Sequence, residues 1–157
     1  MGLKIEKVNK NIEALVSEFF DKYSVDEFEA IFPVEMAQYA KQSFSKKEHS
    51  YAAYQNSDLV GAILFSTQGG VGQLTAIQVD RRLNPVKQLR IRKELVRKYI
   101  ETCQEENCHI CFTWIPHQHV DLLKYYLQEG FERIFTARGF WYKNDYILLV
   151  KELFDFD

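Results

Sequence analysis

Apolar residues recur along the chain at two different spacings, and these spacings predict alternating strands and helices. Residues 3–5 alternate apolar and polar side chains, which predicts a short strand. Between Ile12 and Tyr23 the apolar residues recur every three or four positions, as in a helix with one buried face. Pro33 suits the first turn of a second helix. Two helices are therefore expected before the main sheet.

The middle of the chain predicts three strands. Residues 51–55 and 59–67 are apolar runs on either side of residues 56–58 (NSD), a turn-forming cluster, so they predict a hairpin. Residues 68–70 (QGG) interrupt the pattern. Residues 72–80 then form a third extended run that ends at an aspartate.

A long helix is predicted to begin at Asn84-Pro85, a helix-start signal. Its expected buried face comprises Ile91, Leu95, Val96, Tyr99, Ile100 and Cys103. A strand over 108–115, a helix that ends at Gly130, and two strands over 131–142 and 146–153 complete the pattern. This order predicts an α/β architecture, with a mixed sheet and helices on its faces, in a single domain spanning residues 1–157.

Length and composition narrow the class of protein. A chain of 157 residues can bury one substantial core without metals or disulfides. No apolar run reaches the roughly 18–20 residues of a bilayer helix, and the first ten residues lack the apolar centre of a secretion signal. The three cysteines are odd in number and closely spaced, as expected of reduced thiols. We therefore expect a cytoplasmic protein with no membrane association.

Positive charge is concentrated in one segment. Eight of the 20 Lys and Arg residues lie between Arg81 and Lys98, and Glu94 is the one acid among them. The net charge of the whole chain is nevertheless −2, which argues against a general nucleic-acid binder. The cationic segment is therefore a local feature that needs a local explanation.

Three motifs, in this order, resemble the GNAT acyltransferases. They are the hairpin that ends in Leu59-Val60-Gly61, the helix end at residues 126–131 (YLQEGF), and the closing strand at residues 145–153 (DYILLVKEL). The resemblance covers nearly the whole chain and implies a mixed, mostly antiparallel central sheet flanked by helices on both faces. It also implies an N-acetyltransferase that moves an acyl group from acetyl-CoA to an amine on a small molecule or a protein.

The resemblance places the family's pyrophosphate-binding loop, [RQ]-x-x-G-x-[GA], on residues 87–92, where arginine replaces both glycines. It implies cofactor contacts at Lys87, Gln88, Leu89, Arg90 and Arg92, and pantetheine contacts along the strand at Ile77 and Val79. Three alternatives stay open for the cations. Their side chains hold the phosphates directly, the former loop has closed, or the basic residues are a solvated helix face.

The resemblance assigns Tyr126 as the general acid that protonates the leaving thiolate, and packing in the core is the alternative role. For a general base the sequence offers Asp80, at the end of the third strand, and His119 or His117 in the loop before the tyrosine helix. Water can relay the proton instead. His119 stands where the family usually has an asparagine.

No metal site is expected. Cys108, Cys111, His117 and His119 lack the separation of a zinc finger, and a strand places residues three apart on opposite faces. The resemblance places the acceptor site near an aromatic group that comprises Phe28, Phe32, Tyr39, Phe140, Trp141 and Tyr142. This group indicates a partly apolar acceptor or a homodimer contact, and packing in the core is the alternative role. The alternative function is a catalytically inactive GNAT-fold protein whose basic helix binds an acidic partner.

Overall fold

The computed structural model describes residues 2–24, 49–141 and 144–153. Its elements are β1 (Lys4–Lys7), α1 (Glu13–Ser24), β2 (His49–Gln55), β3 (Asp58–Ser66), the short 3-10 helix η1 (Gln68–Gly70), β4 (Val71–Val79), α3 (Pro85–Glu105), β5 (Ile110–Pro116), α4 (Val120–Gln128), β6 (Glu132–Trp141) and β7 (Asn144–Glu152). This order matches the predicted one. The second helix, expected near Pro33, lies outside the described residues.

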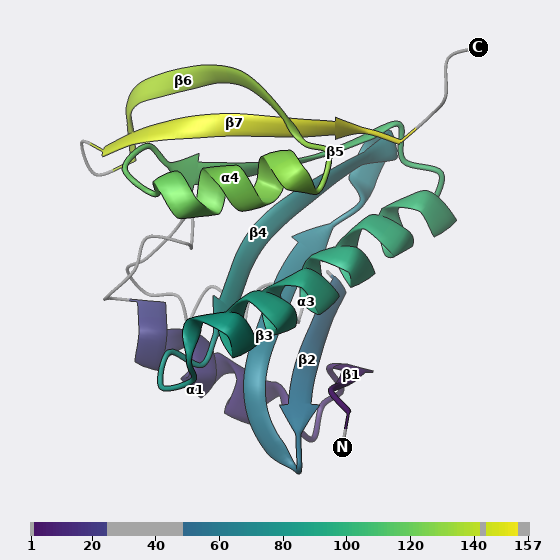
Figure 1. The fold of residues 1–157 in the computed structure, drawn as a ribbon. Coiled ribbons are helices and arrows are strands. Elements are labelled where there is room, and N and C mark those ends of the chain that lie inside the picture. The colour runs from purple at the N-terminus through teal and green to yellow at the C-terminus, as the bar shows by residue number, and fades with distance from the viewer. Residues whose placement is uncertain (1, 25–48, 142–143, 154–157) are drawn as a thin grey trace.

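The described strands form one seven-stranded sheet in the order β1-β2-β3-β4-β5-β7-β6 (Figure 1). Every neighbouring pair is antiparallel except β4 and β5, which are parallel. The prediction of an α/β fold with a mixed, mostly antiparallel sheet is therefore confirmed.

The hairpin between β2 and β3 turns as its sequence predicts. Asn56 and Ser57 both have positive φ angles, 52° and 72°. Two such residues in succession give the tight turn whose twist matches that of the flanking strands, and asparagine tolerates this conformation well. The turn sets the register in which Gln55 pairs with Asp58.

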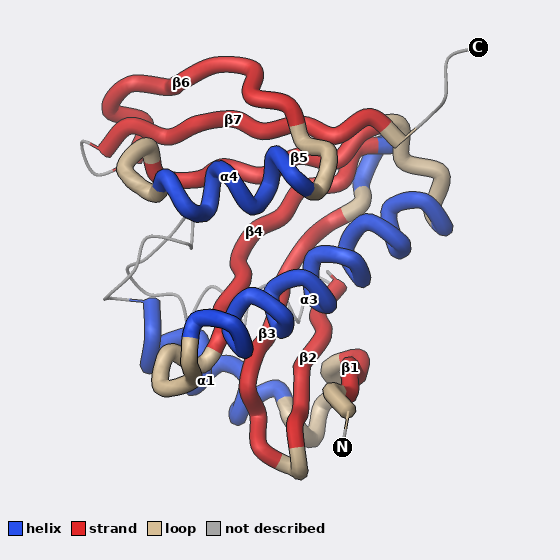
Figure 2. Tube along the Cα trace, viewed as in Figure 1, coloured by secondary structure: helices blue, strands red, loops and turns tan. Residues whose placement is uncertain are grey.

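Helices cover both faces of the sheet (Figure 2). The side chains of Ile63 and Ile77 point to one face and pack in a core with α3 and α4. Their neighbours Leu64 and Ala76 point to the other face and pack in a second core with α1. This alternation follows from the two-residue period of a strand. None of the described helices has the length and apolar character needed to cross a membrane.

The long helix α3 begins where the sequence predicts. The side chain of its N-cap residue, Asn84, accepts a hydrogen bond from the backbone N–H of Lys87 at 2.9 Å, and Pro85 occupies the first helical position. Of the six predicted face residues, Ile91, Leu95, Val96, Tyr99 and Cys103 are buried and Ile100 is half-buried. Arg92 is also buried on this face, although the sequence pattern did not place it there.

The other end of α3 is tied to the sheet by three polar side chains. His49 Nε2 lies 3.0 Å from Thr67 Oγ1 and 3.1 Å from Glu106 Oε1, and the Thr67 hydroxyl donates a hydrogen bond to the Glu106 carboxylate. The bond from Thr67, together with the nearby His49, lowers the pKa of Glu106. This contact joins β2, the end of β3 and the end of α3.

Candidate functional site

Strands β4 and β5 pair at their first residues and then separate. The paired residues are Val71 with Ile110, Gly72 with Cys111, and Gln73 with Phe112. From Leu74 to Val79, none of the described strands pairs with this edge of β4. Figure 1 shows α3 and α4 on the same face of the sheet, on either side of the place where the two strands part. Within the described residues, this edge of β4 is therefore unpaired from Leu74 to Val79, although these residues are buried; we call it the opening between β4 and β5.

The peptide groups of Ile77 and Val79 point into this opening. The N–H of Asp80 donates to the carbonyl of Val60 on β3 at 2.8 Å, so the peptide group of Asp80 faces β3. Successive peptide groups of a strand face opposite edges. The N–H and C=O of Val79, and by the same alternation those of Ile77, therefore face the β5 side. The sequence predicted a binding role for the backbone at these two residues. In the described structure that backbone has no strand partner on the β5 side, and both residues are 2% exposed.

Tyr99 lies at the point where the two strands part. Its hydroxyl donates to the carbonyl of Phe112 on β5 at 2.9 Å, and a Cβ added to Gly72 on β4 would lie 3.3 Å from the same oxygen. Burial, with contributions from the nearby thiols of Cys111 and Cys103, raises the pKa of Tyr99 well above its usual value. Its phenol is therefore a permanent hydrogen-bond donor between the strands.

Tyr126 lies in the same core as Tyr99. Its ring packs edge-on against Tyr125 and Phe131, with centroids 5.1 and 5.2 Å away, and the residue is 1% exposed. Tyr126 is close enough to Tyr99 to contribute to the raised pKa of that phenol. The predicted general acid, Tyr126, therefore shares a core with Tyr99, which lies where β4 and β5 part.

The end of α4 fixes the position of Tyr126. Gly130 has a φ of 94°, which glycine adopts without strain, and its N–H donates to the carbonyl of Leu127 at 3.1 Å. The N–H of Phe131 donates to the carbonyl of Tyr126 at 3.0 Å. These two bonds, with the contact between the Phe131 and Tyr126 rings, form a Schellman cap. The YLQEGF motif thus has a structural basis: the glycine permits the turn, and the phenylalanine holds the tyrosine ring.

The start of α3 offers few free N–H groups to a phosphate. Pro85 has none, the N–H of Lys87 binds the Asn84 side chain, and the N–H of Gln88 binds the Asn84 carbonyl at 3.0 Å. From Leu89 onward each N–H is used within the helix. The two positions where the family has glycine, 90 and 92, therefore lie in the second turn of the helix.

The predicted phosphate-binding cations are not gathered at one place. Arg92 is 7% exposed, and it lies close enough to α4 to affect the pKa of Tyr125. Lys87 and Arg90 are exposed, and together with Leu3 and Gln55 they line a separate hollow of about 40 Å³ beside β1 and β2. Leu89, also predicted as a cofactor contact, is 50% exposed. Of the predicted cations, Arg92 is the one on the α4 side of the helix.

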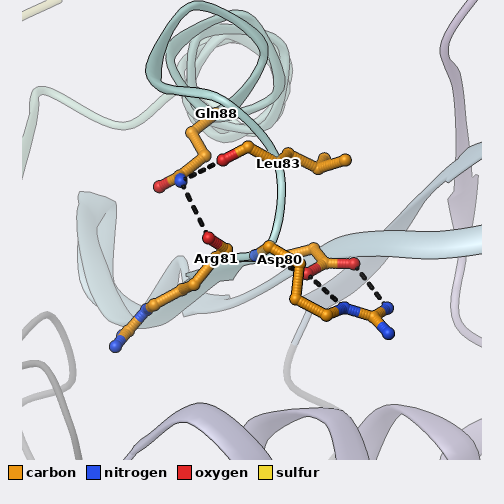
Figure 3. A network of polar contacts seen from close by, with 5 residues as sticks. Asp80, Arg81, Leu83 and Gln88 are labelled. Atoms are coloured by element: carbon orange, nitrogen blue, oxygen red, sulfur yellow. Dashed lines mark hydrogen bonds and ion pairs between the residues drawn. The ribbon is translucent and has the colours of Figure 1, made fainter.

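Asp80 and Gln88 stabilise the loop that joins β4 to α3 (Figure 3). The Asp80 carboxylate accepts hydrogen bonds from the backbone N–H, Nε and Nη2 of Arg82, at 3.0, 3.0 and 2.8 Å. Gln88 donates from its side chain to the carbonyls of Leu83, at 2.7 Å, and Arg81, at 3.3 Å. Both residues were predicted as site residues, and in the described structure both hold this loop.

The two candidate histidines lie in the loop before α4. His119 is half-buried and occupies the N-cap position of α4, but its side chain makes no capping hydrogen bond. His117 is exposed, and its backbone N–H donates to the carbonyl of Asp145 at 2.9 Å. The His119 side chain therefore does not cap α4, and the role of either histidine as a base stays a prediction.

The three cysteines are free and buried. A hydrogen bond to Cys111 and burial raise the pKa of Cys103, and burial raises that of Cys108 to about 11. The thiols of Cys103 and Cys108 therefore stay protonated at neutral pH and are poor nucleophiles. In the ranges that the structure describes, no three His, Cys, Asp or Glu side chains are arranged to hold a metal ion.

Two site features were missed at the sequence level. Tyr99 was assigned to the buried face of α3, but its hydrogen bond to β5 depends on a pairing far along the chain. Tyr125 received no role in the site. It is 6% exposed, and no hydrogen-bond partner for its hydroxyl lies among the described residues. The one sequence signal for a role of Tyr125 was its position beside the predicted general acid, Tyr126.

Of the predicted aromatic group, Phe28, Phe32, Tyr39 and Tyr142 lie outside the described residues, and the backbone alone is described for Phe140 and Trp141.

No protein-family model matches the chain, and no curated protein matches it either. Solved structures do match. An acetyltransferase of the GNAT family from Streptococcus pneumoniae superimposes with a TM-score of 0.75 at 16% identity, over 98% of this chain and 100% of that one. The ribosomal-protein-S18-alanine N-acetyltransferase from Escherichia coli gives 0.78 at 12% identity, over 99% and 97%. The yncA protein from Salmonella typhimurium, solved with its cofactor acetyl-CoA, gives 0.77 at 12% identity, over 99% and 96%. The chain therefore has the fold of the GNAT acetyltransferases, as its sequence pattern predicted.

Proposed function

We propose that the protein transfers an acyl group, most simply acetyl, from acetyl-CoA to an amine. The observation that carries this proposal is the open edge of β4 at Ile77 and Val79, between α3 and α4. A ligand with amide groups can bind such an edge as an added strand does, through main-chain hydrogen bonds. The pantetheine arm of CoA is a ligand of this kind, and a structure with the same fold holds acetyl-CoA.

The proposed reaction needs two contributions from this chain. The amine nitrogen attacks the thioester carbon, so a C–N bond forms and the C–S bond breaks. A peptide N–H at Ile77 or Val79 would donate to the carbonyl oxygen as negative charge develops there. Tyr126 would give its proton to the departing thiolate, while the amine loses a proton to water.

The phosphates of the donor would lie outside the opening, between α3 and α4. We propose that Arg92 is the cation that contacts them, because it lies on the α4 side of α3. A guanidinium binds phosphate with two parallel hydrogen bonds, and it can replace backbone N–H groups that the early helix start has used. Lys87 and Arg90 line the separate hollow on the other side, so we leave them out of this site.

We propose a cytoplasmic, single-domain enzyme, and the acceptor amine belongs to a small molecule or a protein. One structure of the same fold is named for transfer to an alanine of a ribosomal protein, which supports an amine as the acceptor. The aromatic residues expected near the acceptor leave an apolar acceptor and a homodimer contact as equal alternatives.

Two measurements test the proposal. Acetyl-CoA at about 100 times its dissociation constant should stabilise the protein by about 2.7 kcal/mol, which a thermal melt detects. Release of free CoA thiol should then depend on the amine supplied. Tyr126→Phe should lower kcat by roughly 10²–10⁴-fold and leave the affinity for acetyl-CoA nearly unchanged. An unchanged kcat would remove the role of Tyr126, and no thermal shift at millimolar acetyl-CoA would remove the proposal itself.

One observation favours the non-enzymatic alternative. Because α3 begins at Pro85, the N–H groups at positions 90 and 92 are bonded within the helix, and the usual phosphate contact is missing. A GNAT-fold protein without acyl-CoA binding would show this feature. The thermal melt with acetyl-CoA separates the two functions directly.

A further inference from the structure

The outward side of α3 carries an exposed stripe of mixed character. Val86, Arg90, Lys93 and Arg97 follow the spacing i, i+4, i+7 and i+11, so they share one side of the helix, and Leu89 lies beside them. Val86 is 79% exposed and Leu89 50% exposed, and the three cations are exposed as well. We call these five residues the basic face of α3. It spans about 16 Å along the helix axis.

The charges of the basic face have few partners. Arg97 lies 3.4 Å from Glu94, and Arg90 and Lys93 have no ion-pair partner within the described residues. Cations in a row on one helix repel one another. The whole chain has more acidic than basic residues, 22 against 20, so this concentration of positive charge is not a general property of the surface.

A small hollow lies next to the basic face. It has a volume of about 40 Å³ and is lined by Lys87 and Arg90 together with Leu3, Gln55 and Ile91. A lining of two cations with the apolar Leu3 and Ile91 suits a single acidic side chain, whose carboxylate would contact the cations and whose methylene groups would contact the apolar side chains.

We propose that the basic face of α3 docks an acidic protein segment that also carries apolar side chains. Val86 and Leu89 give such a segment apolar contacts, which the phosphate backbone of a nucleic acid does not use. The chain outside this basic segment carries an excess of acidic residues, which would repel an extended polyanion or an anionic membrane. A short segment confined to the basic face would avoid this repulsion. None of these five residues has a role in the proposed acyl transfer, so the proposal does not rest on that function.

The test uses the whole protein and a fluorescent peptide that contains four glutamates and two leucines. Anisotropy measures its affinity at about 50 and about 300 mM salt, where exposed charge pairs are screened to different extents. In a variant with Arg90→Glu, Lys93→Glu and Arg97→Glu, binding at low salt should weaken by about tenfold or more. All three side chains are exposed, so the fold should survive, and circular dichroism checks this. If the triple variant does not fold, the milder double variant Lys93→Gln and Arg97→Gln replaces it in the same binding assay.

A matched control makes the same change in net charge at positions outside α3. Lys10, Lys124 and Arg138 are exposed cations outside α3, and replacing all three by Glu gives the same net charge. This control should bind the peptide nearly as well as the original protein, because its charges lie outside α3.

A second pair of variants tests the apolar part of the face. Val86→Ser and Leu89→Ser should weaken binding severalfold without changing its dependence on salt. The proposal is overturned if the original protein does not bind the peptide, or if the α3 variant and the control lose affinity equally. Tighter binding of an RNA oligonucleotide or of phosphatidylserine vesicles than of the peptide would overturn it as well.

Discussion

Gly72 lies in the short stretch where β4 and β5 are still paired, and a single methyl group there should disturb the whole opening. A Cβ on Gly72 would lie 2.3 Å from Cys103 Sγ, 2.9 Å from Cys111 Cβ and 3.3 Å from Tyr99 Oη. The first two distances are shorter than van der Waals contact allows. Gly72→Ala therefore requires α3 to move away from the sheet or the two strands to move apart.

The size of the effect follows from this overlap. Cys103 and Cys111 are both fully buried, so neither can turn its side chain into solvent. Overpacking of a close-packed core costs about 1–3 kcal/mol. In a domain of this size each kcal/mol lowers the melting temperature by about 2–4 °C. Urea unfolding should thus show a lower midpoint with an unchanged slope.

A double-mutant cycle tests the assigned cause. Cys103→Ala removes the sulfur atom that the new methyl group would strike, so Gly72→Ala should cost at least about 1 kcal/mol less in that background. Gly2→Ala is the control, because nothing lies within 4 Å of a Cβ at that position. Strictly additive costs would refute the steric explanation.

Three further substitutions test particular contacts. Because its bond from Thr67 lowers the pKa of Glu106 below the ordinary 4.5, that bond stabilises the fold above this pH and is lost as the pH falls through the lowered pKa. Glu106→Gln should therefore cost at most about 1 kcal/mol at pH 7, and the difference should shrink in urea titrations as the pH falls below 4.5 and through the lowered pKa of Glu106. Asp80→Asn should cost about 1–3 kcal/mol in thermal melts, since it weakens the bonds to Arg82, and an unchanged melt would contradict that role. Tyr125→Phe should leave stability equal or raise it by about 1 kcal/mol, and a large loss would reveal a partner for its hydroxyl.

Local patterns predicted the parts of the fold that depend on neighbouring residues. The turn at Asn56-Ser57 and the start of α3 at Asn84-Pro85 follow from the conformations that these residues favour, and both are where the sequence placed them. The cap at Gly130 and Phe131 has the same origin. In each case the hydrogen bonds join residues at most five apart, so a short stretch of sequence contains both the donor and the acceptor.

The candidate site was less predictable because it depends on pairing between distant strands. The loss of pairing between β4 and β5 after Gln73 has no local signal in either strand. The burial of Arg92 is similar: its charge indicated an exposed residue, and its position on the inner side of α3 decided otherwise. The hydrogen bond from Tyr99 to Phe112 joins a helix to a strand that follows it, and it appears when both pack on the same sheet.

The start of α3 connects the proposed function with the basic face of the same helix. The helix begins at Pro85 and uses its N–H groups internally. Its cations are distributed around its circumference, so that Arg92 is buried while Arg90, Lys93 and Arg97 are exposed. If side chains rather than backbone N–H groups hold the donor phosphates, acetyl-CoA affinity should fall more steeply with salt than in GNAT enzymes that use glycine loops. The peptide should compete poorly with acetyl-CoA, because the two would bind opposite sides of one helix. Strong competition would mean that the cations act as one site and that the division between the inner and outward sides of α3 is wrong.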